Sequence, residues 1–95
     1  MRICEVIGTV TLSRPHASLH GARFVIGVPF SRKALLANSG PDGEDLVIYD
    51  ELGAGAGMRI AIAESAEAAA PFYPEKKPVD AYCACLLDSV TINKE

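Results

Sequence analysis

Hydrophobic and polar residues alternate along the first part of the chain. From residue 2 to residue 13, one side of an extended chain would be apolar, while the other side would carry mainly Thr, Ser and Glu. A period of two is typical of a strand with one buried face, so we expect a strand over residues 2–13. Its apolar side consists of Cys4, Val6, Val10 and Leu12, with Gly8 among them.

Three further apolar runs predict strands over residues 23–30, 46–49 and 58–63. Turn-forming residues separate these runs. Residues 14–22 contain Pro and Gly and are expected to form a loop. Residues 31–45 are polar and include the run NSGPDG, so we expect them to project as a second loop.

The last third of the chain predicts one short helix and a final strand. Residues 65–70 are expected to form one or two helical turns, with Ser65 as the N-cap and Pro71 as the stop. Residues 79–93 predict the strand. Five or so strands predict a mainly β fold. In so short a chain they favour a small closed or partly open barrel over a sandwich.

Both faces of the final strand are apolar, whereas an antiparallel strand with one solvent-exposed face should carry polar residues on that face. We therefore expect a neighbouring subunit to cover this strand from outside. One face carries Tyr82, Ala84, Leu86, Val90 and Ile92, and the other carries Cys83, Cys85 and Leu87.

The composition agrees with an oligomer. The 95 residues have room for one domain, over residues 1–95, yet 49 % of them are hydrophobic and the mean hydropathy is +0.20. No apolar run reaches the roughly 20 residues that a membrane-spanning helix needs, and no signal peptide is recognisable. We expect a cytoplasmic protein that does not enter a membrane and hides apolar surface against a partner.

The charge balance speaks against nucleic-acid binding. The chain has nine Lys and Arg residues but twelve Asp and Glu residues, and its pI is about 5.3. It therefore lacks the excess of basic residues that would neutralise nucleic-acid phosphates. The three cysteines are odd in number, which fits reduced thiols better than a disulfide framework.

No set of residues for catalysis, cofactor binding or metal binding emerges. The run GAGAG at residues 53–57 is followed by a strand pattern and lacks the third glycine of a dinucleotide fingerprint, so we expect a tight turn where Cβ atoms would clash. His16 and His20 lie in a loop without further ligands. Cys83 and Cys85 are expected to be buried thiols. We interpret the chain as a non-enzyme.

Short segments in three parts of the chain, in order, resemble a known family. The chain begins with MRI, continues with GTV at residues 8–10 and has SLHG at residues 18–21. Residues 50–57 are DELGAGAG, and the end has PVDA at residues 78–81 and LLDSV at residues 86–90. Together these segments resemble the bacterial microcompartment vertex proteins, the EutN/CcmL family, over nearly the whole chain.

The resemblance implies a five-stranded, OB-like β-barrel with one short helix that forms a homopentamer. Such pentamers occupy the vertices of a polyhedral microcompartment shell that is otherwise tiled by hexameric shell proteins. The resemblance implies no cofactor and no catalytic residue. As a hypothesis, close backbone approach places the subunit contact at Gly53, Ala54, Gly55 and Gly57, together with Cys83, Cys85 and Leu87 on the final strand.

Two other functions stay open at this point. An OB-like barrel could be a binding module for single-stranded nucleic acid or a small ligand, although the chain has only three Tyr, three Phe and no Trp for stacking. A small enzyme could use Cys83 or Cys85 as a nucleophile, which would require a reactive thiolate.

Overall fold

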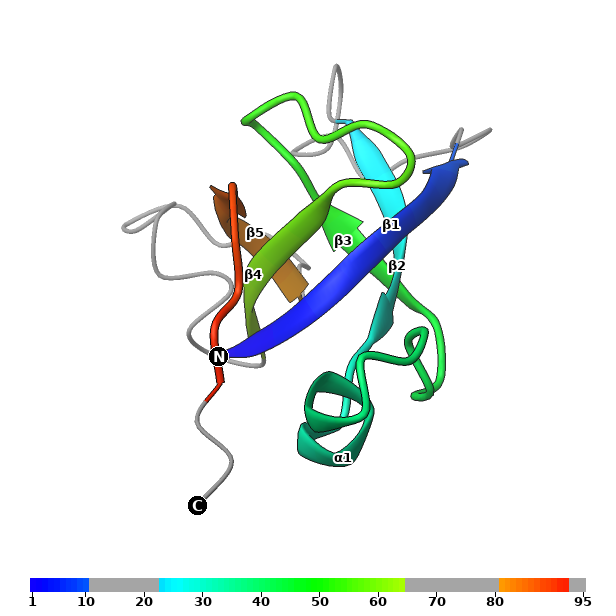
Figure 1. Cartoon of the computed structure of the whole chain (residues 1–95). Coiled ribbons are helices and arrows are strands. Elements are labelled where there is room, and N and C mark those ends of the chain that lie inside the picture. The colour runs from blue at the N-terminus through cyan, green and yellow to red at the C-terminus, as the bar shows by residue number, and fades with distance from the viewer. Residues whose placement is uncertain (11–22, 65–80, 93–95) are drawn as a thin grey trace.

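The described strands close into a barrel. The computed structural model describes residues 1–10, 23–64 and 81–92. Around the barrel the strands follow the order β1-β2-β3-β5-β4, with β4 returning to β1 (Figure 1). All neighbouring pairs are antiparallel except β3 and β5, which are parallel. The elements are β1 (Arg2–Val10), β2 (Phe24–Pro29), α1 (Arg32–Leu36), β3 (Leu46–Tyr49), β4 (Arg59–Glu64) and β5 (Ala81–Leu87).

Alternating side chains of each strand fill the barrel. On β4, Ile60 and Ile62 are wholly buried, as the apolar pattern of that run predicts. The bounds of β3 agree with the predicted ones, and those of β4 differ by one residue at each end. Pro29 is the last residue of β2 and is wholly buried, so the strand is one residue shorter at each end than the predicted 23–30. The core cluster comprises Cys4, Val6, Val25, Ile48, Ala54, Ile60, Ile62, Ala81 and Cys83.

A β-bulge interrupts the pairing of β1 with β2. Val6 pairs with Gly27 and Gly8 pairs with Ile26, so Ile7 is an extra residue with no partner on β2. Burial along β1 still follows the predicted alternation: Cys4 and Val6 are buried and Val10 is half-buried, whereas Ile7 and Thr9 are exposed. Residues 11–13 of the predicted strand lie outside the described residues.

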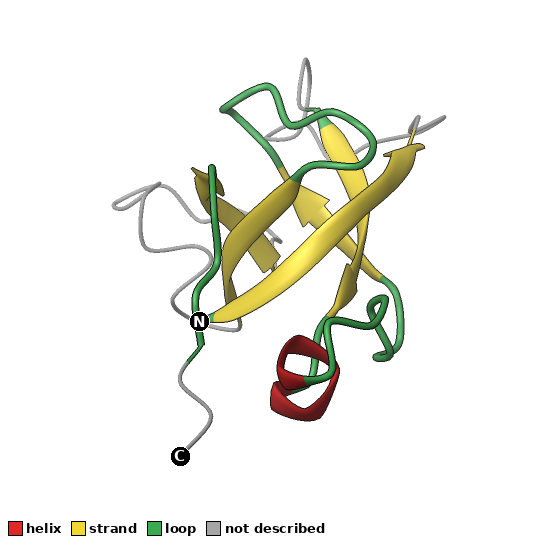
Figure 2. Cartoon of the chain, in the orientation of Figure 1, coloured by secondary structure: helices red, strands yellow, loops and turns green. Residues whose placement is uncertain are grey.

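Helix α1 corrects the prediction that residues 31–45 form only a loop (Figure 2). Ser31 caps the helix, because its hydroxyl oxygen accepts a hydrogen bond from the Ala34 N–H at 3.0 Å. Asp42 holds this cap in turn: its carboxylate accepts from the Ser31 N–H at 2.8 Å and from the Ser31 hydroxyl at 2.6 Å. These bonds lower the pKa of Asp42. The helix lies at the end of the barrel opposite the loop that joins β3 to β4 (Figure 1).

The final strand is shorter than predicted. Strand β5 ends at Leu87, whereas the prediction extended to residue 93. Val90 and Ile92 continue the apolar pattern but follow the end of the strand, and they line a small hollow together with residues of α1 and Arg59 of β4. The helix predicted at residues 65–70 and the loop predicted at residues 14–22 lie outside the described residues.

Candidate functional site

The loop between β3 and β4 folds around the side chain of Asp50. This carboxylate is buried, and it accepts hydrogen bonds from the Leu52 N–H at 2.9 Å and the Ala54 N–H at 2.8 Å. An Asp that binds backbone N–H groups two and four residues further on fixes the path of the loop from within. The first half of the DELGAGAG segment therefore has a defined structural role.

Arg23, just before β2, clamps the same loop from outside. Its Nη1 lies 3.1 Å from Asp50 Oδ2, and its Nη2 donates a hydrogen bond of 2.6 Å to the Ala54 carbonyl oxygen. The Asp50 N–H also donates to the Arg23 carbonyl oxygen at 2.9 Å. Sequence analysis missed this pair, because 27 residues separate the two partners and Arg23 belongs to no recognisable motif.

The second half of the loop is attached to β1. The Gly57 N–H donates to the Val6 carbonyl oxygen at 2.7 Å, and the Val6 N–H donates to the Met58 carbonyl oxygen at 2.9 Å. Gly53 and Gly57 have φ values of +82° and +87°, a conformation that favours glycine. The expected reason for this glycine run was a clash of Cβ atoms, and that reason is wrong: an added Cβ would meet nothing within 4 Å at either residue.

A row of aromatic rings connects the loop to β5 on the outside of the barrel. The Phe24 and Tyr49 rings meet edge to face at 5.3 Å, and the Tyr49 and Tyr82 rings stack at 6.1 Å. The Tyr82 hydroxyl donates a hydrogen bond of 2.8 Å to Glu51 in the loop. This hydrogen bond is the main cause that raises the pKa of Tyr82 to about 12. The loop is thus held by β1, by the start of β2 and by β5.

The residues expected at a subunit contact divide into two sets. Ala54 and Cys83 are wholly buried within the single chain, so their side chains have no surface left for a neighbour. The remaining residues are at least partly accessible and lie in the loop or in the last part of β5. They are Gly53, Gly55, Gly57, Cys85 and Leu87.

Burial decides the chemistry of two thiols. Desolvation raises the pKa of Cys83 from 9.0 to about 12, and the nearby negative charge of Asp50 adds to the increase. Desolvation also raises the pKa of Cys4 from 9.0 to about 11. Both thiols are therefore protonated near neutral pH, which argues against Cys83 as a nucleophile. All three cysteines are free.

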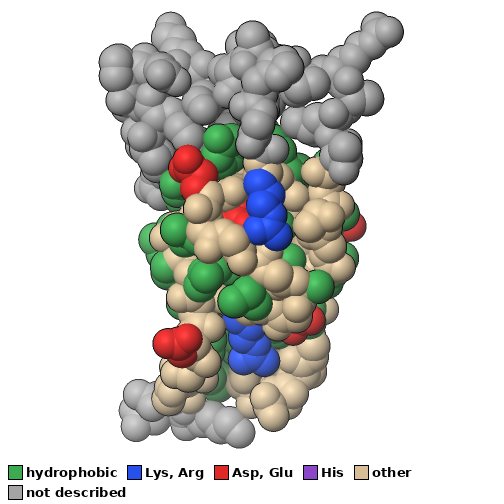
Figure 3. Space-filling model, turned by 90° about the horizontal axis from the view of Figure 1, so that it is seen from above, with side chains coloured by type: hydrophobic (Ala, Val, Ile, Leu, Met, Phe, Trp, Pro, Cys, Tyr) green, Lys and Arg blue, Asp and Glu red, His purple; other side chains and the backbone are tan. Residues whose placement is uncertain are grey.

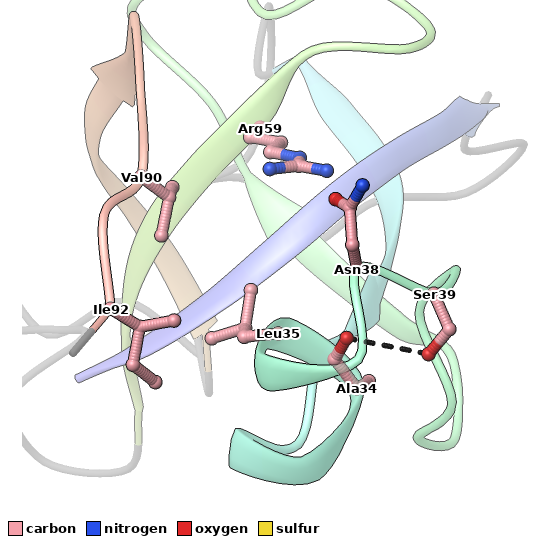
Figure 4. A pocket seen from close by; sticks show the side chains of 7 residues that line it. All are labelled: Ala34, Leu35, Asn38, Ser39, Arg59, Val90 and Ile92. Atoms are coloured by element: carbon pink, nitrogen blue, oxygen red, sulfur yellow. Dashed lines mark hydrogen bonds between the residues drawn. The ribbon is translucent and has the colours of Figure 1, made fainter. Parts of the chain in front are cut away.

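A small hollow lies between α1, β4 and the segment after β5. Its volume is about 40 Å³, well below the roughly 300 Å³ of a typical ligand pocket. Figure 4 shows Val90 and Ile92 directed toward the helix, with the Arg59 guanidinium and the Asn38 amide on the other side. The Arg59 guanidinium also lies over the Phe30 ring, 5.0 Å from its centroid. The hollow is a packing gap rather than a ligand site.

On the barrel end that carries the loop, the charged side chains of the described residues do not form a patch of one sign. Figure 3 shows hydrophobic side chains there between separate basic and acidic groups. Among the described residues, no three His, Cys, Asp or Glu side chains lie close enough together to hold a metal ion. The same residues contain no helix that is long and apolar enough to cross a membrane.

Comparison with known proteins identifies the family. Residues 1–88 match the family described as ethanolamine utilisation protein EutN/carboxysome. Since this match spans most of the sequence, the chain belongs to that family. No match to a curated protein was found.

Solved structures share the whole fold. The CcmL structure of Gloeobacter violaceus has a TM-score of 0.84 at 27 % identity, and the match covers 98 % of this chain and 91 % of CcmL. GrpN of Rhodospirillum rubrum, a pentameric microcompartment shell protein, has a TM-score of 0.81 at 26 % identity and 98 % and 100 % coverage. EutN of Escherichia coli, at 22 % identity, has a TM-score of 0.79 with 97 % and 89 % coverage and shows the same fold.

Proposed function

We propose that this chain is a structural protein whose homopentamers cap the vertices of a bacterial microcompartment shell. The observation that carries the proposal is the family match over residues 1–88, together with a closed barrel that superposes on a pentameric shell protein over 98 % of the chain. The protein is a shell component and not an enzyme. The binding-module alternative is not favoured, because the family and its solved members are shell proteins.

The function is geometric. A flat layer of hexagons cannot close on itself, and pentagons supply the curvature that closes a polyhedron. Five copies in a ring use head-to-tail contacts that close after the fifth subunit. Within this proposal, the rims of the pentamer bind hexameric shell proteins.

The subunit contact is proposed at the loop of residues 53–57 and the end of β5. Gly53, Gly55 and Gly57 present backbone at the surface, which permits a neighbour to approach closely. Cys85 and Leu87 are half-buried in the single chain and would lose further surface to the neighbour. Ala54 and Cys83 support this contact only from inside the barrel.

Native mass spectrometry of the purified chain tests the assembly. We expect a dominant species at five times the subunit mass of 10.0 kDa. The variant Gly55→Leu should remain folded, because an added Cβ meets only Met58 Sδ, at 3.7 Å, and it should no longer form pentamers. Gly55→Ala is the matched control. A wild-type monomer, dimer or hexamer at micromolar concentration would contradict the proposal.

Coexpression with hexameric shell proteins tests the vertex role. With the wild-type chain, electron microscopy should show closed polyhedral shells. Without it, or with Gly55→Leu, the hexamers should form open sheets or tubes. Shells that close equally well without any vertex protein would contradict the role.

A further inference from the structure

Ala54 is fixed from three directions in the middle of the glycine run. Its side chain is wholly buried in the core, its N–H donates to Asp50 Oδ2 at 2.8 Å, and its carbonyl oxygen accepts from Arg23 Nη2 at 2.6 Å. Arg23 Nη1 lies 3.1 Å from the same Asp50 Oδ2. The guanidinium therefore bridges the carboxylate and the Ala54 carbonyl oxygen. We name Arg23, Asp50 and Ala54 the loop clamp.

The residues on either side of Ala54 have unusual backbone freedom. Residues 53–57 contain three glycines, and two of these, Gly53 and Gly57, have positive φ values. Glycine loses more conformational freedom on ordering than any other residue. A loop of this composition would therefore sample many backbone conformations if only its two ends were held. The loop clamp selects one of them, because it holds the residue between the first two glycines.

Arg23 is suited to select the loop conformation rather than to stabilise the barrel. Its side chain is 42 % exposed, so water screens the ion pair with the buried Asp50 and limits its contribution to folding. The fork of the guanidinium nevertheless reaches two acceptors at once, a geometry that lysine cannot reproduce. The Asp50 N–H also donates to the Arg23 carbonyl oxygen at 2.9 Å, which fixes the backbone that carries the fork.

A loop that is already ordered binds a neighbour more tightly than one that must become ordered on contact, because no ordering entropy is then lost on binding. We propose that Arg23 is a positioning residue for pentamer assembly. Through Asp50 and Ala54 it holds residues 53–57 in the conformation that the neighbouring subunit binds. This inference rests on the proposed pentamer and on its proposed contact at this loop. Because every subunit presents the loop once, one substitution weakens all five contacts of the ring.

Subunit exchange between pentamers tests this role. Pentamers labelled with a heavy isotope are mixed with unlabelled ones, and native mass spectrometry follows the appearance of mixed pentamers. Arg23→Met keeps a long unbranched side chain but has no donor, and it should exchange subunits at least about tenfold faster than the wild type. Arg23→Lys keeps the charge but cannot bridge both acceptors, so it should exchange nearly as fast as Arg23→Met.

Arg2→Met is the matched control. Arg2 also forms an ion pair of 3.1 Å, with Glu64, and its side chain is 46 % exposed. This ion pair joins the start of β1 to the end of β4 and not to the loop. Arg2→Met should therefore exchange subunits at the wild-type rate. Equal acceleration by Arg2→Met and Arg23→Met would show that the loss of a surface charge, and not the release of the loop, weakens the ring.

Hydrogen exchange tests whether Arg23 holds the loop within a single chain. The Gly55→Leu background should keep the chain monomeric. In this background, Arg23→Met should speed exchange of the Ala54 amide at least about tenfold, while the amides of β4 keep their rates. An unchanged rate at Ala54 would show that the loop does not depend on Arg23, and would overturn the positioning role.

A double-mutant cycle separates positioning from a direct contact between Arg23 and the neighbouring subunit. Asp50→Asn keeps one acceptor oxygen but loses the charge that Arg23 binds. If Arg23 acts through Asp50, the double variant should exchange subunits no faster than the faster single variant. Effects that multiply would mean that Arg23 acts independently of Asp50, which would overturn the role.

The outcomes separate this role from the proposed function. A wild-type exchange rate for Arg23→Met would overturn the positioning role and leave the pentamer standing. A wild-type rate for Arg23→Lys alone would overturn the role of the fork, because the charge would then suffice. A wild-type chain that is not a pentamer would overturn the proposed function, and the role of Arg23 in assembly would fall with it.

Discussion

The guanidinium of Arg23 bridges the Asp50 carboxylate and the Ala54 carbonyl oxygen, at 3.1 Å and 2.6 Å, and so ties the start of β2 to the loop that follows β3. The two partners are unequal. Asp50 is buried and accepts two further backbone hydrogen bonds, whereas the side chain of Arg23 is 42 % exposed. Their replacement should therefore have unequal consequences.

Asp50→Ala should lower the free energy of unfolding by about 1–3 kcal/mol, because the buried Ala54 N–H loses its acceptor. Arg23→Met should cost less than about 1 kcal/mol, since water reaches the guanidinium and screens the ion pair. Urea unfolding at one protein concentration measures both, because assembly also contributes to stability. Glu44→Ala is the control. Equal losses for the two variants would show that the ion pair, and not the backbone hydrogen bonds, holds the loop.

Gly57→Ala should destabilise the chain by about 1–2 kcal/mol, because its φ of +87° strains any residue that has a Cβ. Gly55→Ala should change the stability by less than about 0.5 kcal/mol, because its φ is not positive and its added methyl group meets only Met58 Sδ. Thermal unfolding compares the two. A larger loss for Gly55→Ala would mean that close contacts, rather than backbone conformation, select glycine in this loop.

Gly27 points into the core, where an added Cβ would lie 2.5 Å from Ile48 Cδ1 and 3.3 Å from Cys4 Cβ. Gly27→Ala should therefore cost about 1–3 kcal/mol through overpacking. Ile48→Val removes the Cδ1 atom and alone should cost about 0.5–1.5 kcal/mol.

The double variant should be more stable than the sum of the two losses predicts, because the valine makes room for the alanine methyl group. Denaturant midpoints of the wild type, the two single variants and the double variant provide the free energies for this double-mutant cycle. Simple additivity would mean that the Ile48 side chain can turn away at no cost.

Stability should fall at alkaline pH because of the buried thiols. The pKa of Cys4 is raised to about 11 and that of Cys83 to about 12, from 9.0. The folded state therefore keeps protons that the unfolded chain releases above pH 9. The contribution is complete below pH 9 and is lost as the pH rises toward 12.

The urea midpoint should drop between pH 8 and pH 10.5, and it should drop less for Cys83→Ala. Alkylation at pH 8 should modify Cys85 before the other two cysteines, which should react only on unfolding. Rapid modification of Cys83 in the folded protein would contradict its burial.

Local patterns predicted the strands well, but not the features that depend on distant partners. The run at residues 46–49 became β3 with the predicted bounds, because its apolar residues and flanking turns lie within one short segment. Helix α1 was missed because Ser31 becomes a stable cap through Asp42, which is 11 residues further along the chain. The bulge at Ile7 exists only in relation to β2, so no pattern within β1 could reveal it.

The sequence by itself determined that this is a small, mainly β chain with a high share of hydrophobic residues, and its ordered motifs determined the family. Periodicity and turn residues reflect local conformation, because both depend only on residues that are close together in the sequence. The tertiary structure decided that the barrel closes and that Cys83 and Ala54 face inward. It also decided that Arg23 clamps the loop at Asp50. These features depend on the register between strands that are far apart in the chain, and register is set only when the strands pack together.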